Sequence, residues 1–384
     1  MTSAIVLGGG MVGSVMGADL SADGAFEVTV ADAREESLAR AAKRAGGRVK
    51  TVRADLSDPR VVRELVVGYD IVLGALASHL GFGALRAVIE AGKAYCDISF
   101  MPEDARELDG LARERGVTAI VDCGVAPGMS NLLAAHGAAM LDVCENIEIY
   151  VGGLPVERRW PFEYKAGFAP ADVIEEYTRP ARLVEHGKIV VREALSEPEL
   201  MDLPGVGTLE AVNTDGLRSI ADTMGVAFMK EKTLRYPGHY ELMRVLRSVG
   251  LFSKDEVEVG GVRVRPLELL STLMFPQWTY EEGEADLTVM RIIVDGVRGG
   301  RAVRHTFDLL DHMDPATGFT SMSRTTAFPC TIMARRVAAG AIGKTGVLPP
   351  ELLGDDAALV GHVLDELRAR GVVYSHTEGT PPGR

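Results

Sequence analysis

Cysteine is scarce in this 384-residue chain, and none of the cysteines forms a CxxC pair. Scattered single cysteines are typical of reduced thiols, which argues against a disulfide scaffold or a zinc site. Long hydrophobic runs are also missing, since no apolar stretch approaches the ~20 residues of a membrane-spanning helix. The first residues lack the basic region and long apolar core of a signal peptide. We therefore expect a cytoplasmic protein with no membrane partner.

Positive charge is in short supply as well. The chain has 41 Lys and Arg against 54 Asp and Glu, a formal net charge of -13. Such a surface repels phosphate backbones, so we expect no nucleic-acid partner. No HExxH, P-loop or GxSxG motif occurs, and these are the local signatures of several hydrolase classes. A hydrophobic content of 47% is ordinary for a soluble globular chain, and the length favours two domains.

Glycine, in contrast, is concentrated near the N-terminus. The apolar run Ala4 to Leu7 leads into a stretch that fits G-x-G-x-x-G, followed by a helix pattern: Gly8, Gly9, Gly10, Met11, Val12, Gly13. In a dinucleotide-binding loop the first glycine makes the turn, the second lets a pyrophosphate approach, and the third lets helix and strand pack closely. The helix N-terminus offers free N–H groups to the phosphates. The alternative is a tight turn in another kind of α/β protein.

An acidic residue follows at the spacing that this motif requires. The second strand pattern, Glu27 to Ala31, ends at Asp32, about 20 residues after the loop. A carboxylate there accepts hydrogen bonds from a ribose 2′-hydroxyl and repels a 2′-phosphate. The sequence therefore predicts NAD as the cofactor, while the nearby Arg34 keeps NADP open.

The strand–helix alternation continues along the first third of the chain. Four further strand patterns follow: Val49 to Ala54, Asp70 to Ala75, Ala94 to Ile98 and Thr118 to Asp122. This alternation predicts a Rossmann-type doubly wound parallel sheet, in which ligands bind at the carboxyl ends of strands. The expected cofactor contacts beyond the glycine loop are Asp55, Leu56, Ala75, Leu76, Ser78 and Gly124. For Asp55 a second interpretation stays open, because Ser57-Asp58-Pro59 is a helix-start signature and Asp55 also fits as a cap of that helix.

The rhythm changes after residue 128. Glu145 to Val151 and Leu287 to Val294 are strand patterns, and Asp314 to Gly318 is a turn signal between Arg301 to Leu309 and Gly318 to Phe328. We expect a second α/β domain over 129–328 with a mainly antiparallel sheet and helices over 171–177 and 240–249. Helices within 329–374 should return to complete the first domain, 1–128. The polar tail 375–384 is predicted to be disordered.

Two polar stretches in the second domain carry candidate chemistry. In KEKTLRYPGHY, Arg235 has the fork that binds a carboxylate, and His239 titrates near neutral pH. In WPFEYKAGF, Tyr164 and Lys165 are placed to reach a ligand, and a lysine in an apolar site loses its proton and serves as a base. The competing interpretations are a solvated arginine with a packed histidine, and an aromatic seam between domains.

Five metal-ligand residue types gather near the turn signal: His305, Asp308, Asp311, His312 and Asp314. In the predicted hairpin, alternation spreads these side chains over both faces. We therefore expect no metal site.

Together these residues resemble the saccharopine dehydrogenase family, most closely its lysine 6-dehydrogenase branch. The resemblance covers nearly the whole chain apart from the tail and lies in GGGMVG, GVAPGM, YVGGLP, EYTRPA and KTLRYPGH. It implies an NAD(P)-dependent oxidoreductase that acts at a C–N bond of an amino acid. It also implies a dinucleotide domain closed by C-terminal helices, and a second domain that binds substrate and forms a homodimer or higher oligomer.

The resemblance also implies which residues touch the substrate. They are Ser99, Phe100, Thr233, Leu234 and Arg235, with Arg235 on the α-carboxylate. Saccharopine-forming members have an Asp at the position of Ala126 and an Arg close to Asn213 and Thr214. A missing Arg argues against saccharopine, which carries extra carboxylates.

We therefore expect oxidative deamination of the L-lysine ε-amine to a semialdehyde that cyclises to piperideine-6-carboxylate, with His239 or Lys165 as the base. Reductive coupling of the saccharopine or carboxynorspermidine type is the enzymatic alternative. An NAD(H)-binding redox sensor without turnover is the non-enzymatic one.

Overall fold

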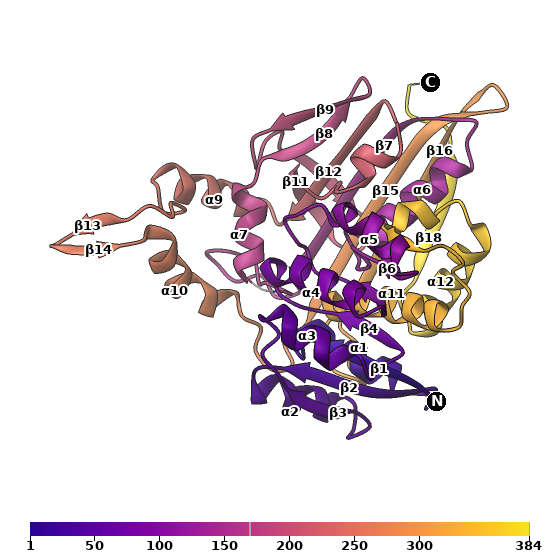
Figure 1. Ribbon diagram of the computed structural model, residues 1–384. Helices are drawn as coiled ribbons and strands as arrows, with labels where there is room; N and C mark the ends of the chain where they lie inside the picture. The colour runs from indigo at the N-terminus through magenta and orange to yellow at the C-terminus, as the bar shows by residue number, and fades with distance from the viewer. Residues whose placement is uncertain (169, 384) are drawn as a thin grey trace.

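The protein is an α/β chain built on two large sheets, as Figure 1 shows in a computed structural model that describes residues 1–168 and 170–383. One sheet has seven parallel strands, and the other has nine strands and is mainly antiparallel. The predicted fold class, a doubly wound parallel sheet followed by a mainly antiparallel second sheet, is therefore confirmed.

The parallel sheet reverses its strand order between β1 and β4, which opens a crevice at their carboxyl ends. Both strands are apolar and buried, as a sheet covered on two faces requires. The last strand, β17, comes from the C-terminal part of the chain, and its three residues were too few to give a sequence signal. In spatial order the strands are β17 (Gly346–Leu348), β6 (Thr118–Ile120), β5 (Ala94–Asp97), β4 (Ile71–Gly74), β1 (Thr2–Leu7), β2 (Phe26–Asp32) and β3 (Lys50–Arg53).

Helices connect these strands. α3 begins where the Ser57-Asp58-Pro59 signal predicts, because Asp58 Oδ1 accepts from Arg60 N at 2.9 Å and Pro59 needs no donor partner. Asp55 accepts from Ser57 N at 3.0 Å and so shapes the turn that precedes α3. The elements are α1 (Met11–Leu20), α2 (Glu35–Arg44), α3 (Pro59–Val66), α4 (Ser78–Glu90), the 3-10 helix η1 (Ala105–Leu108), α5 (Asp109–Glu114) and α6 (Met129–Ala139).

The second sheet has a single parallel pair, β7 with β12, among antiparallel neighbours. Its long hairpin turns at Gly299 and Gly300, where both residues have positive φ. The strands are β7 (Val143–Pro155), β8 (Ala181–Glu185), β9 (Lys188–Arg192), β10 (Glu199–Leu203), β11 (Gly207–Asn213), β12 (Phe228–Arg235), β15 (Asp286–Arg298), β16 (Arg301–His312) and β18 (Tyr374–Gly379).

The remaining elements of the second half lie beside this sheet. A small two-stranded hairpin projects away from the rest of the molecule (Figure 1). The elements are α7 (Pro170–Thr178), α8 (Ile220–Thr223), α9 (His239–Ser248), β13 (Val257–Val259), β14 (Val262–Val264) and α10 (Pro266–Trp278). The predicted helices over 171–177 and 240–249 match α7 and α9 to within one residue at every end.

Helix α11 (Ser321–Ala338) connects the two halves, since it packs against α1 and β5 on one side and β15 on the other. The prediction of a strand over Gly318 to Phe328 is wrong, because the Thr320 side chain caps the helix at Ser323 N. The predicted domain boundary between 328 and 329 therefore falls inside α11. A 3-10 helix, η2 (Pro350–Leu353), and α12 (Ala357–Ala369) follow.

The prediction of a disordered tail over 375–384 is wrong for its first five residues. Ser375 to Gly379 belong to β18, which pairs antiparallel with β16, and the His376 ring stacks on Phe307 at 4.5 Å. Strand addition uses backbone groups, so a polar sequence forms it readily and hides it from a search for apolar patterns. Arg384 lies outside the described residues. None of the helices described is long and apolar enough to cross a membrane.

Candidate functional site

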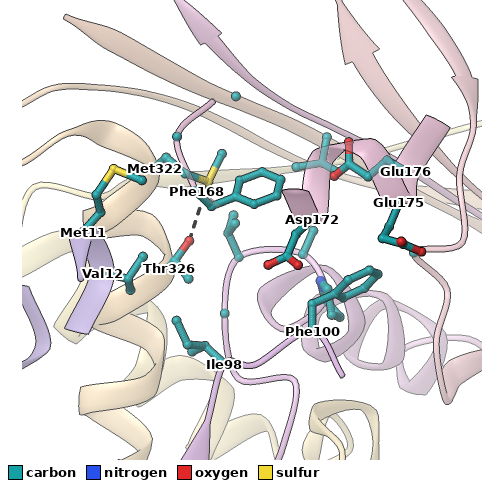
Figure 2. Close-up of a pocket in the computed structure, with 18 of the residues that line it drawn as sticks. Met11, Val12, Ile98, Phe100, Phe168, Asp172, Glu175, Glu176, Met322 and Thr326 are labelled. Carbon is teal, nitrogen blue, oxygen red and sulfur yellow. Dashed lines mark hydrogen bonds between the residues drawn. The ribbon is translucent and has the colours of Figure 1, made fainter. Parts of the chain in front are cut away.

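A cavity of about 570 Å³ lies between the carboxyl edge of the parallel sheet and the second sheet with α7. Figure 2 shows Met11, Val12 and Thr326 on one side, and the carboxylates of α7 on the other. The glycine loop and α11 thus line one end of the cavity, and α7 lines the opposite end, where Phe100 also lies.

The end beside the glycine loop combines glycine backbone with the side chains of Met11 and Val12. Gly10, Met11, Val12 and Gly13 line it, together with Ala75, Leu76 and Gly124. A Cβ on Gly13 would lie 1.9 Å from Gly8 O, so only glycine allows the loop to pack on the strand. A Cβ on Gly10 would meet no atom within 4 Å, which leaves open space beside the loop. A glycine cradle at a helix N-terminus fits a dinucleotide pyrophosphate.

Asp32 lies beneath this loop and not among the lining residues. Its Oδ2 accepts from Gly9 N and its Oδ1 from Arg34 N, both at 2.8 Å. The carboxylate therefore holds the glycine loop in shape, while the side chains of Arg34 and Arg40 reach the cavity. Four other expected cofactor contacts lie outside the lining: Gly8, Asp55, Leu56 and Ser78. Gly8 still contributes to the site, because its φ of +102° allows the turn that leads from β1 into the glycine loop.

Alternation along β12 forms the floor of the opposite end. Glu231, Thr233 and Arg235 line the cavity, as residues at every second position of a strand share a face. Leu234 points to the other face, where it is fully buried in an apolar cluster. The expected substrate contact of Leu234 is therefore not made by its side chain.

Arg235 is only 2% exposed and is held from several sides. Its Nη2 donates to Glu176 Oε2 at 2.9 Å, its Nη1 donates to Leu234 O at 2.9 Å, and its guanidinium lies 4.5 Å from the Tyr164 ring centroid. Its Nε is buried and has no hydrogen-bond partner in the described chain. A buried donor without a partner is costly, and a ligand carboxylate would satisfy it.

Carboxylates gather around this arginine. Asp172, Glu175 and Glu176 come from α7 (Figure 2), while Asp215 follows β11 and Glu231 lies on β12. Burial raises the pKa values of Asp172 and Glu176. Among the residues proposed from the sequence, none was an acid at this end. The alternation of β12 would have identified Glu231 once Arg235 was placed in the cavity.

Of these five acids, Glu231 is the most buried, with 3% of the residue exposed. Its Oε2 accepts from Thr214 Oγ1 at 2.5 Å and from Gly216 N at 3.1 Å. Burial raises its pKa to about 8, and the nearby Glu176 and Asp215 act in the same direction. This carboxyl therefore keeps its proton to a higher pH than an ordinary glutamate does.

The two bases expected from the sequence lie elsewhere. His239 is 2% exposed and does not line the cavity. Its Nδ1 lies 2.8 Å from Phe162 O, which can only accept, so Nδ1 carries the proton and Nε2 accepts from Tyr177 Oη at 2.8 Å. Burial lowers its pKa to about 3. Both ring nitrogens are thus occupied, and the ring stays neutral behind Tyr164.

Lys165 is directed into a second, smaller hollow of about 350 Å³ formed with Thr279 and Tyr280. Its ammonium pairs with the buried Glu284 and donates to Thr279 O at 3.1 Å. Lys165 lies outside the main cavity and its partners are Glu284 and Thr279, so its position gives no support to a role as a base there.

The remaining expected substrate residues divide. Phe100, Tyr164 and Thr233 line the cavity. Ser99 is buried below it, where its hydroxyl donates to Asp97 Oδ1 at 2.8 Å. Across residues 1–168 and 170–383, no group of three or more His, Cys, Asp or Glu side chains is placed to hold a metal ion.

Comparison with known proteins agrees with this architecture. The saccharopine dehydrogenase NADP binding domain matches residues 4–120, and the saccharopine dehydrogenase C-terminal domain matches residues 124–372. The solved apo saccharopine dehydrogenase (L-Glu forming) of Saccharomyces cerevisiae has a similar fold, with a TM-score of 0.83 at 18% identity over 99% of this chain and 100% of that one.

Curated relatives are distant but extensive. The saccharopine dehydrogenase [NADP(+), L-glutamate-forming] of Schizosaccharomyces pombe is 24% identical over 97% of this chain and 98% of its own. Carboxyaminopropylagmatine dehydrogenase of Synechocystis is 22% identical, with 94% of each chain covered.

Mouse mitochondrial alpha-aminoadipic semialdehyde synthase is 22% identical over 97% of this chain, which spans only 47% of that longer protein. The two domain matches cover nearly the whole sequence, and the glycine cradle fits a nicotinamide dinucleotide, NAD or NADP. The chain belongs to the saccharopine dehydrogenase family of oxidoreductases.

Proposed function

We propose that this protein oxidises the ε-amine of L-lysine, with NAD(P) as the hydride acceptor, to a semialdehyde that cyclises to piperideine-6-carboxylate. The observation that carries the proposal is the charge at the substrate end. Five carboxylates line it, from Asp172, Glu175, Glu176, Asp215 and Glu231, against the two guanidiniums of Arg179 and Arg235. Arg182 and Lys254, outside the lining, pair with Asp215 and Glu175, so five acids face four cations and a small excess of negative charge remains. That excess favours a substrate with more ammonium than carboxylate groups.

Each end of a diamino acid then has a complementary partner. Arg235 lines the cavity, and its protein partners do not use every N–H group of the guanidinium, which supports docking of the α-carboxylate there. Glu176 holds the guanidinium in place through Nη2. The remaining carboxylates favour the ammonium groups, and Tyr164 and Phe100 give the aliphatic chain an apolar wall. A nicotinamide dinucleotide, when bound, supplies the hydride acceptor, and enclosure between the two halves keeps water from the reacting carbon.

The second candidate function is oxidation or formation of a secondary C–N bond, as in the reactions named for the relatives from S. pombe and Synechocystis. The family match favours it. The position of Asn213 and Thr214 counts against saccharopine itself. Asn213 is buried against Ser196, and Thr214 presents a hydroxyl where saccharopine-forming members have an arginine close by.

The deciding experiment is reduced-cofactor absorbance with purified protein, NAD or NADP, and a panel of L-lysine, L-ornithine, diaminopimelate, saccharopine and simple diamines. We expect the largest kcat/KM with L-lysine. Faster turnover of saccharopine would reject the lysine proposal in favour of the second candidate. Cofactor binding without turnover of any compound would favour the redox-sensor alternative.

Three further expectations stay predictions: the preference for NAD over NADP, the homodimer or higher oligomer, and the cytoplasmic location. Light scattering of the purified protein tests the oligomer directly.

A further inference from the structure

Oxidation of a primary amine requires the loss of a proton before the loss of hydride. An ammonium has no free lone pair, so its carbon cannot release hydride until the nitrogen is neutral. We propose that Glu231 is the carboxylate that takes this proton at the substrate end of the cavity. The inference rests on the proposed amine oxidation and identifies the residue that makes it feasible.

Position is the first argument. Glu231 lies two residues before Thr233 and four before Arg235 on the same face of β12, and all three line the cavity. Four residues of strand extend about 13 Å. The Arg235 and Glu231 side chains both line the cavity and shorten this span, so a substrate whose carboxylate docks on Arg235 can direct its distal amine toward Glu231.

The hydrogen bonds of Glu231 are the second argument. Both of those described, from Thr214 Oγ1 and Gly216 N, end on Oε2. The carboxyl is thus held rigidly through one oxygen, and Oε1 is left for the substrate nitrogen. Rigid placement of a base on a strand is what general base catalysis needs.

Glu231 also differs in its partners from the other four acids that line the substrate end. Glu176 is bound to Arg235, Asp215 to Arg182 at 2.9 Å, and Glu175 to Lys254 at 3.3 Å. Asp172 accepts from Ser78 Oγ, at the start of α4, at 2.6 Å. Glu231 forms no ion pair with any described residue, so no cation holds its carboxyl in the charged form.

The groups around Glu231 give its carboxyl a proton affinity that suits a base. The charged groups of the adjoining elements are Glu176 and Arg179 on α7, Arg182 on β8, Asp215 after β11 and Arg235 on β12 itself. Burial and the two acids raise the pKa of Glu231 to about 8. A base acts best when its pKa lies near the working pH.

The proton step balances without an external redox partner. The substrate R–CH2–NH3+ and ionised Glu231 become R–CH2–NH2 and protonated Glu231. The N–H electron pair stays on nitrogen as the lone pair that assists the later departure of hydride from carbon. Protonated Glu231 then returns its proton to solvent.

The test compares Glu231→Gln with Glu148→Gln as a matched control. Gln keeps the size of the side chain and an oxygen for Thr214 and Gly216. Glu148 lies on the neighbouring β7, outside the cavity lining, where it accepts from Tyr150 Oη at 2.7 Å. Steady-state rates are measured across pH for the amine that the wild-type enzyme oxidises best, alongside fluorescence titration with the reduced cofactor.

We expect Glu231→Gln to lower kcat by about 100-fold or more, the usual contribution of a general base. Cofactor affinity should stay unchanged, and Glu231→Asp should restore part of kcat. The wild-type kcat/KM should rise with pH through about 8, and this limb should vanish in Glu231→Gln only. An unchanged kcat and an unchanged rising limb in Glu231→Gln would overturn the proposal, as would loss of that limb in Asp172→Asn instead.

Failure of the proposed function gives a different result. If the wild-type enzyme oxidises none of the amines, the oxidation is rejected, while the proton-holding carboxyl still has its own readout. Difference infrared spectra between pH 7 and pH 9 should show a protonated carboxyl band, to which Asp97 also contributes, that is smaller in Glu231→Gln and unchanged in Glu148→Gln. Identical spectra for the three proteins would overturn the assignment of the proton to Glu231.

Discussion

The two ends of the cavity are built in different ways. The nucleotide end uses backbone from one continuous loop, Gly8 to Gly13, and Asp32 supports it through hydrogen bonds to the main chain. The substrate end uses side chains from α7, β12 and the loop after β11, and most of its polar groups carry charge. The first end depends on the absence of side chains, and the second depends on which side chains are buried together.

This difference determines how each end tolerates change. A backbone cradle binds phosphates through N–H groups and fails when a side chain enters it. A set of buried charges discriminates between ligands and fails when one partner is removed, because its counterpart remains buried and unpaired. Substitutions at the two ends should therefore separate cofactor binding from substrate binding.

The largest effect is expected at the glycine loop. Gly13→Ala places a Cβ 1.9 Å from Gly8 O, so strand and helix must separate and both stability and nucleotide affinity should be lost. Gly10→Ala, with no atom within 4 Å, should keep the wild-type melting temperature and weaken only nucleotide binding. Thermal unfolding and fluorescence titration with the reduced cofactor measure the two properties. Equal melting temperatures for both variants would contradict the close packing at Gly13.

Arg235→Ala tests the opposite end. Loss of hydrogen bonds to a charged group costs about 1.5–3 kcal/mol, which corresponds to a rise in KM of ~10–150-fold. The affinity for NAD should not change, because Arg235 lies on the second sheet. The double variant Arg235→Ala with Glu176→Gln controls for the carboxylate left unpaired. An Arg235→Ala enzyme with wild-type KM would remove this residue from substrate binding.

The stability of the protein should depend on pH through Glu231. Burial raises its folded pKa to about 8, above the ordinary value of 4.5. Between these values the folded state holds a proton that the unfolded state releases, so stability falls as pH rises through this window. The free energy of unfolding of the wild type relative to Glu231→Gln should fall by on the order of 1 kcal/mol per pH unit and level off above the window. Chemical denaturation at several pH values gives this difference, and a pH-independent difference would contradict the raised pKa.

The smallest effect concerns cofactor choice. Asp32→Ser removes the charge beneath the loop and leaves Arg34 and Arg40 at the cavity. We expect the affinity ratio of NADP to NAD to rise by about tenfold, or ~1.4 kcal/mol. Asp55→Ser serves as the control and should leave the ratio unchanged, because Asp55 bonds to Ser57 and not to the glycine loop. No change in Asp32→Ser would remove this residue from cofactor selection.

Local sequence patterns predicted the elements whose causes are local. The glycine loop, the strands that follow it and the start of α3 were predicted because turn geometry, apolar runs and capping residues act over a few neighbours. The patterns failed where neighbours do not decide. Within Gly318 to Phe328, polar and apolar residues alternate little, and the residues from Ser321 onward belong to α11, which Thr320 caps. Ser375 to Gly379 form a strand only because the edge of β16 is available for pairing.

The site shows the same division at the level of single residues. Arg235 and Thr233 were identified from the sequence and lie in the cavity, whereas His239 and Lys165 are as polar and lie outside it. Composition could not distinguish the two groups, because the difference lies in their buried interaction partners. His239 bonds with Phe162 and Tyr177, and Lys165 forms an ion pair with Glu284.

By itself, the sequence determined the family, the nucleotide loop and the arginine at the substrate end. Each was recognised from short contiguous motifs, which do not depend on the rest of the fold. Only the tertiary structure brings the five acids of the substrate end together and determines which of them form ion pairs. Asp172 to Glu176, Asp215 and Glu231 are separate in the chain and meet because α7 and the loop after β11 close over β12. Burial and proximity, which set the charge of a carboxyl, exist only after that closure.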